Sequence, residues 1–168
     1  MTTRITGLII AVLVFAADQF SKYIVMVPLD LKARGQIEIF SFFNLTWVEN
    51  YGVSMGFLTA DTALGQWLLV ALTSAISAVV LVWMWRERNR QDVLALGLIL
   101  GGALGNIVDR VRFGHVVDFA DLHFGDIRPF LVFNVADAAI TIGVVILLMR
   151  ALLVREKPKV PEKENADA

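Results

Sequence analysis

Four long apolar segments dominate the pattern of hydrophobic and polar positions along this chain of 168 residues. They cover roughly residues 5–27, 63–85, 93–111 and 131–154. A helix needs about 20 mainly apolar residues to cross the hydrocarbon core of a bilayer. The pattern therefore predicts a polytopic α-helical membrane protein with four transmembrane helices, forming a single integral-membrane domain over residues 1–154.

The stretch between the first two apolar segments, residues 28–62, has a different pattern. Within residues 36–48, β-branched and aromatic side chains alternate imperfectly with polar ones, which favours strands. Too few residues are available there to bury a separate core. We therefore expect a small extracytoplasmic β-sheet lying on the membrane surface.

Composition agrees with a membrane protein and excludes several kinds of site. Hydrophobic residues make up 57% of the chain, and the mean hydropathy is +0.68, too high for a soluble domain of this length. The net charge of −1 gives no reason to expect a nucleic-acid partner, and the absence of cysteine excludes thiol catalysis and thiolate metal sites. A metal site built from His115, His123, Asp121 and Asp126 is conceivable, but histidines in a polar loop are more often simply solvated.

The distribution of basic residues predicts the orientation in the membrane. Of the 15 Lys and Arg residues, nine lie before the first segment, between the second and third, or at the end of the fourth and beyond it. The positive-inside rule then places both termini in the cytoplasm. The tail, residues 155–168, carries prolines among charges and is expected to be disordered. A cleaved signal peptide is an alternative for the first segment, but its apolar character resumes at residues 23–27, which favours a complete helix.

Two aspartates, Asp118 and Asp137, are the strongest candidates for chemistry. An ionisable group at membrane depth costs about 3 kcal/mol on insertion scales, and Asp137 has no basic residue three or four positions away. If the two carboxylates meet, they do not both ionise readily, so one retains a proton. One aspartate then serves as a base on water while the other polarises a carbonyl group.

Other polar residues near the helix ends admit structural explanations. Asp18 and Lys22 are one helical turn apart, so we expect an intrahelical ion pair with Lys22 extending to the interface, or else a contact to a neighbouring helix or a lipid headgroup. Asp109 and Arg110 are expected to form an interfacial ion pair.

Two further patterns concern helix faces. Gly97, Gly101 and Gly105 provide a face for close helix packing, within one chain or between two. Asn134, Asp137 and Thr141 form a polar stripe that should face the interior of the bundle or water.

Four motifs, taken in order, resemble those of the bacterial lipoprotein signal peptidases (signal peptidase II). They are Asp18-Gln19-Phe20-Ser21-Lys22, residues 50–56 (NYGVSMG), residues 101–110 (GGALGNIVDR) with the following residues 114–119 (GHVVDF), and residues 133–137 (FNVAD). The resemblance covers residues 10–150. The second motif departs from the family, which more often has Ala and Phe where this chain has Ser54 and Met55.

The resemblance implies an aspartyl protease of the bacterial inner membrane, with its active site near the periplasmic face. Such an enzyme removes the signal peptide of a prolipoprotein by cleaving on the amino side of a diacylglyceryl-cysteine. Asp118 and Asp137 would be catalytic, and no metal or organic cofactor is implied. Implied partners are the lipidated signal-peptide substrates, membrane lipids and cyclic-peptide inhibitors such as globomycin. Residues that would shape or support the site are Asn50, Gly52, Asn106, Asp109, Arg110, Asn134, Asp18 and Lys22.

Two other functions are alternatives to this one. A small proton-coupled transporter would suit four helices and an acidic group such as Asp18, but the halves of the chain show no internal repeat. A serine/lysine signal peptidase would use Ser54 or Ser21 with a lysine. Ser21 and Lys22 are adjacent, however, and a single helix points them apart.

Overall fold

Four long helices make up most of the computed structural model, which describes residues 2–52, 63–125 and 127–153. They are α1 (Thr2–Met26), α3 (Ala63–Arg86), α4 (Arg90–Phe113) and α5 (Val135–Leu153). Each is long and apolar enough to cross a membrane, so the prediction of a polytopic helical membrane protein is confirmed. The fourth helix begins at Val135, four residues later than predicted, because residues 131–134 lead into it as a loop.

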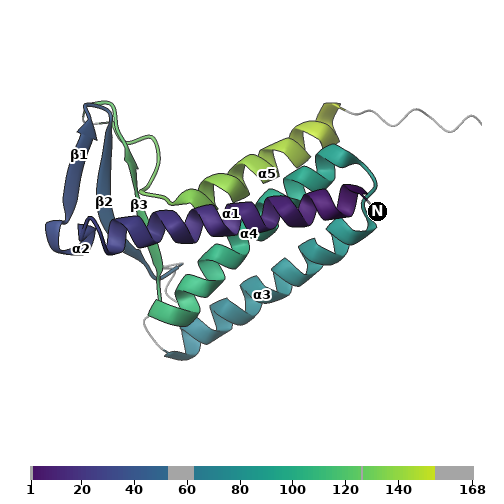
Figure 1. The fold of residues 1–168 in the computed structure, drawn as a ribbon, viewed down its shortest axis with the longest axis horizontal. Coiled ribbons are helices and arrows are strands. Elements are labelled where there is room, and N and C mark those ends of the chain that lie inside the picture. The colour runs from purple at the N-terminus through teal and green to yellow at the C-terminus, as the bar shows by residue number, and fades with distance from the viewer. Residues whose placement is uncertain (1, 53–62, 126, 154–168) are drawn as a thin grey trace, which may run out of the picture.

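Helix α4 is the centre of the bundle and contacts the other three long helices (Figure 1). Half of its most apolar window is buried, against 11% to 22% in the other three. Its glycines permit this close approach. A Cβ atom at Gly97 would lie 2.6 Å from the backbone oxygen of Gly7 on α1, and a Cβ atom at Gly101 would lie still closer to that of Ala11. The glycine face therefore packs α4 against α1 within one chain.

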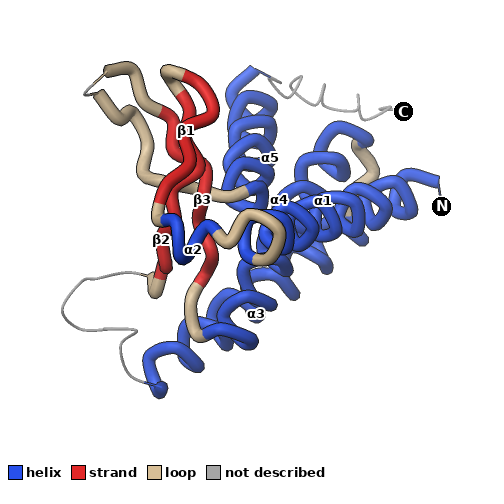
Figure 2. Tube along the Cα trace, turned by 60° about the vertical axis from the view of Figure 1, so that its left-hand side comes forward, coloured by secondary structure: helices blue, strands red, loops and turns tan. Residues whose placement is uncertain are grey.

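A three-stranded antiparallel sheet lies across one end of the bundle (Figure 2). Its strands, in spatial order, are β1 (Gln36–Phe40), β2 (Phe43–Asn50) and β3 (Val116–Leu122), and a short helix α2 (Leu31–Arg34) precedes them. The first two strands confirm the β-rich prediction. Strand β3 was not predicted, because its residues Val116 to Asp121 are all buried and so show no alternation between apolar and polar positions.

Gly114 turns the chain from α4 into β3. Its φ of +79° is in the left-handed region that favours glycine, and its N–H donates to the Arg110 carbonyl at 3.0 Å. Strand β3 then runs past the start of α5, where Ala120 pairs with Phe133. This connection brings Asp118 on β3 close to the first turn of α5.

The start of α1, the link between α3 and α4, and the end of α5 all lie at the end of the bundle opposite the sheet (Figure 1). Several predicted features lie outside the described residues: the part of the β-rich stretch after Gly52, including Ser54 and Met55, Asp126, and the tail at 155–168.

Candidate active site

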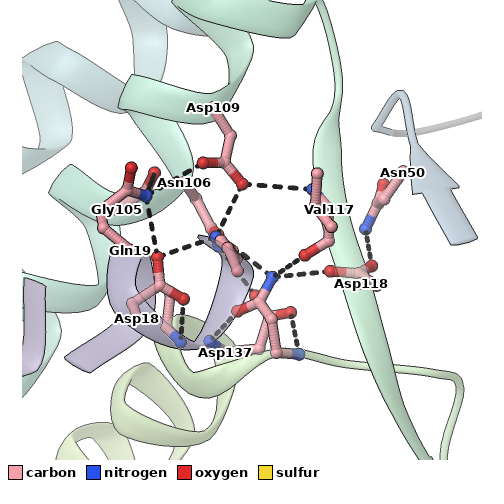
Figure 3. Close-up of polar contacts among 12 residues, drawn as sticks. Asp18, Gln19, Asn50, Gly105, Asn106, Asp109, Val117, Asp118 and Asp137 are labelled. Carbon is pink, nitrogen blue, oxygen red and sulfur yellow. Dashed lines mark hydrogen bonds and ion pairs between the residues drawn. The ribbon is translucent and has the colours of Figure 1, made fainter. Parts of the chain in front are cut away.

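Asn134 forms hydrogen bonds with the two candidate catalytic aspartates, Asp118 and Asp137, which are labelled in Figure 3. Its side-chain Nδ2 donates to Asp118 Oδ1 on β3 at 2.6 Å. Its backbone N–H donates to Asp137 Oδ2 at 3.3 Å, and its side-chain Oδ1 accepts from the Asp137 N–H at 2.9 Å. The chain therefore doubles back between β3 and α5. Both carboxylates accept hydrogen bonds from one buried residue, Asp118 from its side chain and Asp137 from its backbone N–H.

The position of Asp137 follows from the way α5 begins. Asn134 is the N-cap residue, and its carbonyl accepts the first helical hydrogen bond, from Ala138, at 3.2 Å. The reciprocal bonds between Asn134 and Asp137 form a capping box, which satisfies two N–H groups that a helix start leaves free. Because capping holds both side chains in place, the carboxylate of Asp137 stays at the first turn of the helix.

The polar stripe predicted on the fourth helix is only partly correct. Asn134 is buried and Asp137 is half-buried, but Thr141 is exposed. Asp137 and Thr141 are one turn apart and line the same cavity, so these two residues share one face of the helix as predicted. Asn134 precedes the helix and reaches inward from the loop, so it does not belong to this face.

Asn50 approaches Asp118 from strand β2. Its Nδ2 donates to Asp118 Oδ2 at 3.0 Å, while its Oδ1 accepts from the Gly52 N–H at 2.9 Å. Gly52 has a φ of +98°, and a Cβ atom there would lie 2.6 Å from Leu69 of α3. Both features favour glycine at this position.

The environment of Asp118 disfavours its charged form. Burial, together with the nearby charge of Asp137, raises the pKa of Asp118 to about 6, although hydrogen bonds from Asn50 and Asn134 act in the opposite direction. Asp118 therefore holds a proton at higher pH than an ordinary aspartate.

Lys22 is the centre of a buried polar network beside the two aspartates. Its Nζ lies 2.8 Å from Asp18 Oδ2 and 2.7 Å from Asp109 Oδ2, and the lysine side chain is only 3% exposed. It also donates to Asn106 Oδ1 at 3.3 Å. The expectation that Lys22 extends to the interface was therefore wrong: it points inward because two carboxylates on two helices compensate its desolvation.

This network extends to the segments that carry the candidate catalytic residues. Asp18 Oδ1 accepts from the Ala136 N–H of α5 at 3.0 Å, and Asp109 Oδ2 accepts from the Val117 N–H of β3 at 3.2 Å. Asn106 Nδ2 donates to Asp137 Oδ1 at 2.8 Å. The network thus fixes the backbone beside Asp137 and beside Asp118.

The ion pair predicted between Asp109 and Arg110 does not form, because Asp109 faces Lys22 instead. The Nε atom of Arg110 is buried and makes no hydrogen bond among the described residues. Arg110 lines a cavity of about 200 Å³ between α3, α4 and α5, together with Asn106. Its side chain is therefore placed to meet a ligand in that cavity.

Gln19 is a member of the site that the sequence analysis did not identify. Its Nε2 donates to Asp109 Oδ1 at 3.0 Å and to Asp18 Oδ2 at 3.2 Å (Figure 3). The only signal in the sequence was its place between Asp18 and Lys22. Its neighbour Ser21 donates to the Asp18 carbonyl of its own helix at 2.8 Å, which disfavours Ser21 as a nucleophile.

The two histidines lie apart from this network. His115 is in ring contact with Tyr51, with centroids 5.3 Å apart, and its Nε2 lies 3.9 Å from Glu49. No group of three or more His, Cys, Asp or Glu side chains in the described part of the chain is arranged to hold a metal ion.

Comparison with known proteins gives a consistent result. A family model described as signal peptidase II matches residues 10–153. Lipoprotein signal peptidases from Rhizorhabdus wittichii and Sphingopyxis alaskensis are 61% and 62% identical to this chain, over 98% and 90% of it and over 95% and 87% of their own lengths. A bacterial membrane enzyme solved by the in meso method is similar in structure, with a TM-score of 0.77, 31% sequence identity and 94% of each chain covered.

Proposed function

The chain belongs to the signal peptidase II family and is a multi-pass membrane protease, and on that premise we propose that it acts on prolipoproteins through the aspartates Asp118 and Asp137. It cleaves on the amino side of a diacylglyceryl-modified cysteine. The observation that supports this best is Asn134, which hydrogen-bonds to both carboxylates at once. The charge of Asp137 is also near enough to raise the pKa of Asp118, which supports joint action of the two groups on one water molecule.

The proposed reaction needs one protonated and one ionised carboxylate. We assign the proton to Asp118, because burial raises its pKa to about 6, and bound substrate would exclude more water. Asp137 then takes a proton from the attacking water while Asp118 donates a hydrogen bond to the scissile carbonyl oxygen. When the tetrahedral intermediate collapses, the C–N bond breaks and the proton held by Asp137 passes to the departing amine.

The remaining site residues act by position. Asn50 and Asn134 orient Asp118, and Asn106 orients Asp137. Gly52 lets the chain turn beside Asn50. The ion-pair network of Lys22, Asp18 and Asp109 fixes the positions of β3 and α5 relative to each other. Arg110 faces the substrate.

The fold also supports a route for the substrate. A signal peptide is an apolar helix and reaches a site at one end of a helical bundle sideways through the bilayer. With both termini in the cytoplasm, the sheet end lies at the periplasmic face of the inner membrane. Cyclic peptides of the globomycin type would compete for the same site.

Mass spectrometry of a cleavage reaction tests the substrate and the position of the cut. Wild type in lipid–detergent micelles would receive one prolipoprotein peptide with a diacylglyceryl-cysteine and one with an unmodified cysteine. We expect a single cut before the modified cysteine and at least roughly 100-fold slower cleavage of the unmodified peptide. Cleavage elsewhere, or equal rates, would overturn the proposal, and inert wild type with proton-dependent flux in proteoliposomes would favour transport.

A further inference from the structure

Glu49, near the end of β2, is the centre of a second polar cluster, whose other members come from α2, from β2 and from the residue before β3. Its Oε1 lies 2.8 Å from Lys32 Nζ and accepts a hydrogen bond from Trp47 Nε1 at 3.3 Å. Its Oε2 accepts from the Tyr51 hydroxyl at 2.7 Å. His115 completes the cluster: its Nε2 lies 3.9 Å from Glu49 Oε1, and its ring contacts that of Tyr51.

The cluster holds Glu49 in its charged form. The hydrogen bond from Lys32, followed by that from Tyr51, lowers the pKa of Glu49 to about 2. A single exposed ion pair contributes little to a fold, but this carboxylate is only 24% exposed and has partners on three segments of the chain. Glu49 therefore ties α2 and the end of β2 to the start of β3.

Asn50 lies between two members of this cluster along the chain. Successive side chains of a strand point to opposite faces, so Glu49 points to α2 while Asn50 donates to Asp118 Oδ2 at 3.0 Å (Figure 3). The ladder between β2 and β3 ends at Asn50, and Tyr51 follows beyond it, where the Glu49 carboxylate holds it. The cluster thus fixes the chain on both sides of the residue that bonds to Asp118.

We propose that Glu49 is a positioning residue for the reaction: it holds the end of β2 so that Asn50 stays within hydrogen-bonding distance of Asp118. This inference rests on the proposed function and deepens it. The Asn50 amide spans from the Gly52 N–H, at 2.9 Å, to the Asp118 carboxylate. If the chain after β2 moves, the amide therefore moves away from the carboxylate.

Removal of the Glu49 carboxylate has opposite effects on Asp118 according to its role. A negative charge nearby raises the pKa of an aspartate, so loss of Glu49 as a bare charge would lower the pKa of Asp118. The Asn50 hydrogen bond lowers that pKa, so loss of Glu49 as a positioning residue should raise it. Three charged groups that also face Asp118 are left in place by the test: Lys22, Arg110 and Asp137.

Titration of Asp118, followed by NMR of its carboxyl carbon in detergent micelles, tests the proposal without substrate. The signal is assigned by its loss in Asp118→Asn. We expect Glu49→Gln and Tyr51→Phe each to raise the pKa of Asp118 by roughly 0.5, and to move the alkaline limb of kcat/KM by the same amount. Tyr51→Phe changes no charge and keeps the ring beside His115. Glu38→Gln is the matched control, because Glu38 is an exposed carboxylate of the same sheet, and it should change neither quantity.

A double substitution shows whether Glu49 acts through Asn50. In an Asn50→Leu background, Glu49→Gln should raise the pKa of Asp118 no further. A lowered or unchanged pKa in both Glu49→Gln and Tyr51→Phe, or an equal further rise in the double variant, would overturn the inference. If wild type cleaves correctly but these pKa shifts are absent, the inference alone fails; if wild type does not cleave, the proposed function fails.

Discussion

At the scale of single residues, the site depends on buried polar groups that satisfy one another. Asp118 accepts hydrogen bonds from Asn50 and Asn134, and Lys22 lies between Asp18 and Asp109. Each group is costly to bury alone and becomes tolerable only with its partners. Removal of one partner should therefore change either the pH profile of activity or the stability of the fold, depending on which group is left unpaired.

The pH profile should report the proton on Asp118. Because the folded pKa is raised to about 6, the protonated form that the mechanism needs is lost as pH rises through that value. We expect kcat/KM to fall on the alkaline side with an apparent pKa near 6. Asn50→Leu removes a hydrogen bond that lowers the pKa, so the alkaline limb should move to higher pH.

Thr46→Val is the control for this profile, because Thr46 lies on the same strand but donates to Asp121. Its alkaline limb should coincide with that of wild type. An Asn50→Leu limb that moves to lower pH would contradict the assignment of the proton.

Removal of the Lys22 charge should destabilise the protein strongly. Lys22→Met leaves Asp18 and Asp109 buried without a cation, and breaking a buried ion pair costs about 3–5 kcal/mol. Lys32→Met is the matched control: Lys32 is 66% exposed and pairs with Glu49 at 2.8 Å, so about 1 kcal/mol or less should be lost. Thermal unfolding in detergent measures both, and similar losses would show that Lys22 is not the centre of the network.

At the scale of elements, the start of α5 combines two tasks in one residue. Asn134 caps the helix and also donates to Asp118 across to β3. Strand β3 is in turn held by Asp109 of α4, through the Val117 N–H. The geometry of the proposed active site therefore depends on how α4, β3 and α5 join.

Two substitutions separate the tasks of Asn134. Asn134→Ser keeps a good N-cap but loses the hydrogen bond to Asp118, whereas Asn134→Ala loses both. We expect the serine variant to be about 1 kcal/mol more stable than the alanine variant, while both lose most turnover. Full turnover in the serine variant would remove the bridging role of Asn134.

The sequence predicted the elements unequally. Long apolar runs were sufficient for the four helices. Asn50, Asn106, Asp118, Asn134 and Asp137, which only the family resemblance placed in one site, are joined by hydrogen bonds in the structure. The third strand was not predicted, because Val116 to Asp121 are buried on both faces and periodicity carries no information there. The inward direction of Lys22 and the contacts of Gln19 depend on how α1 packs against α4, which one helix pattern does not reveal.

At the scale of the whole molecule, the two ends of the helical bundle differ. The sheet and the proposed site lie at one end of the bundle, and the start of α1, the α3–α4 link and the end of α5 lie at the other (Figure 1). Basic residues gather at the second end, among them Arg4, Arg86 and Arg150. This distribution favours that end in the cytoplasm.

Cysteine labelling tests this orientation cleanly, because the chain has no cysteine of its own. Phe40 lies in the sheet and is 57% exposed, whereas Arg88 lies in the α3–α4 link. In spheroplasts, a membrane-impermeant maleimide should label Phe40→Cys at once and Arg88→Cys only after permeabilisation. The reverse pattern would invert the proposed topology.

The central claim is that Asp118 and Asp137 together carry out the cleavage. The most direct measurement is the rate of signal-peptide release from a diacylglyceryl-modified prolipoprotein by wild type, Asp118→Asn and Asp137→Asn, with Asp121→Asn as a control for loss of a buried carboxylate on the same strand. An asparagine is nearly isosteric but neither takes up nor donates the required proton. We predict that each of the first two variants folds and is slower by roughly 100- to 10,000-fold, while Asp121→Asn stays within about threefold of wild type. Substantial turnover by a folded Asp118→Asn or Asp137→Asn protein would contradict the two-aspartate account.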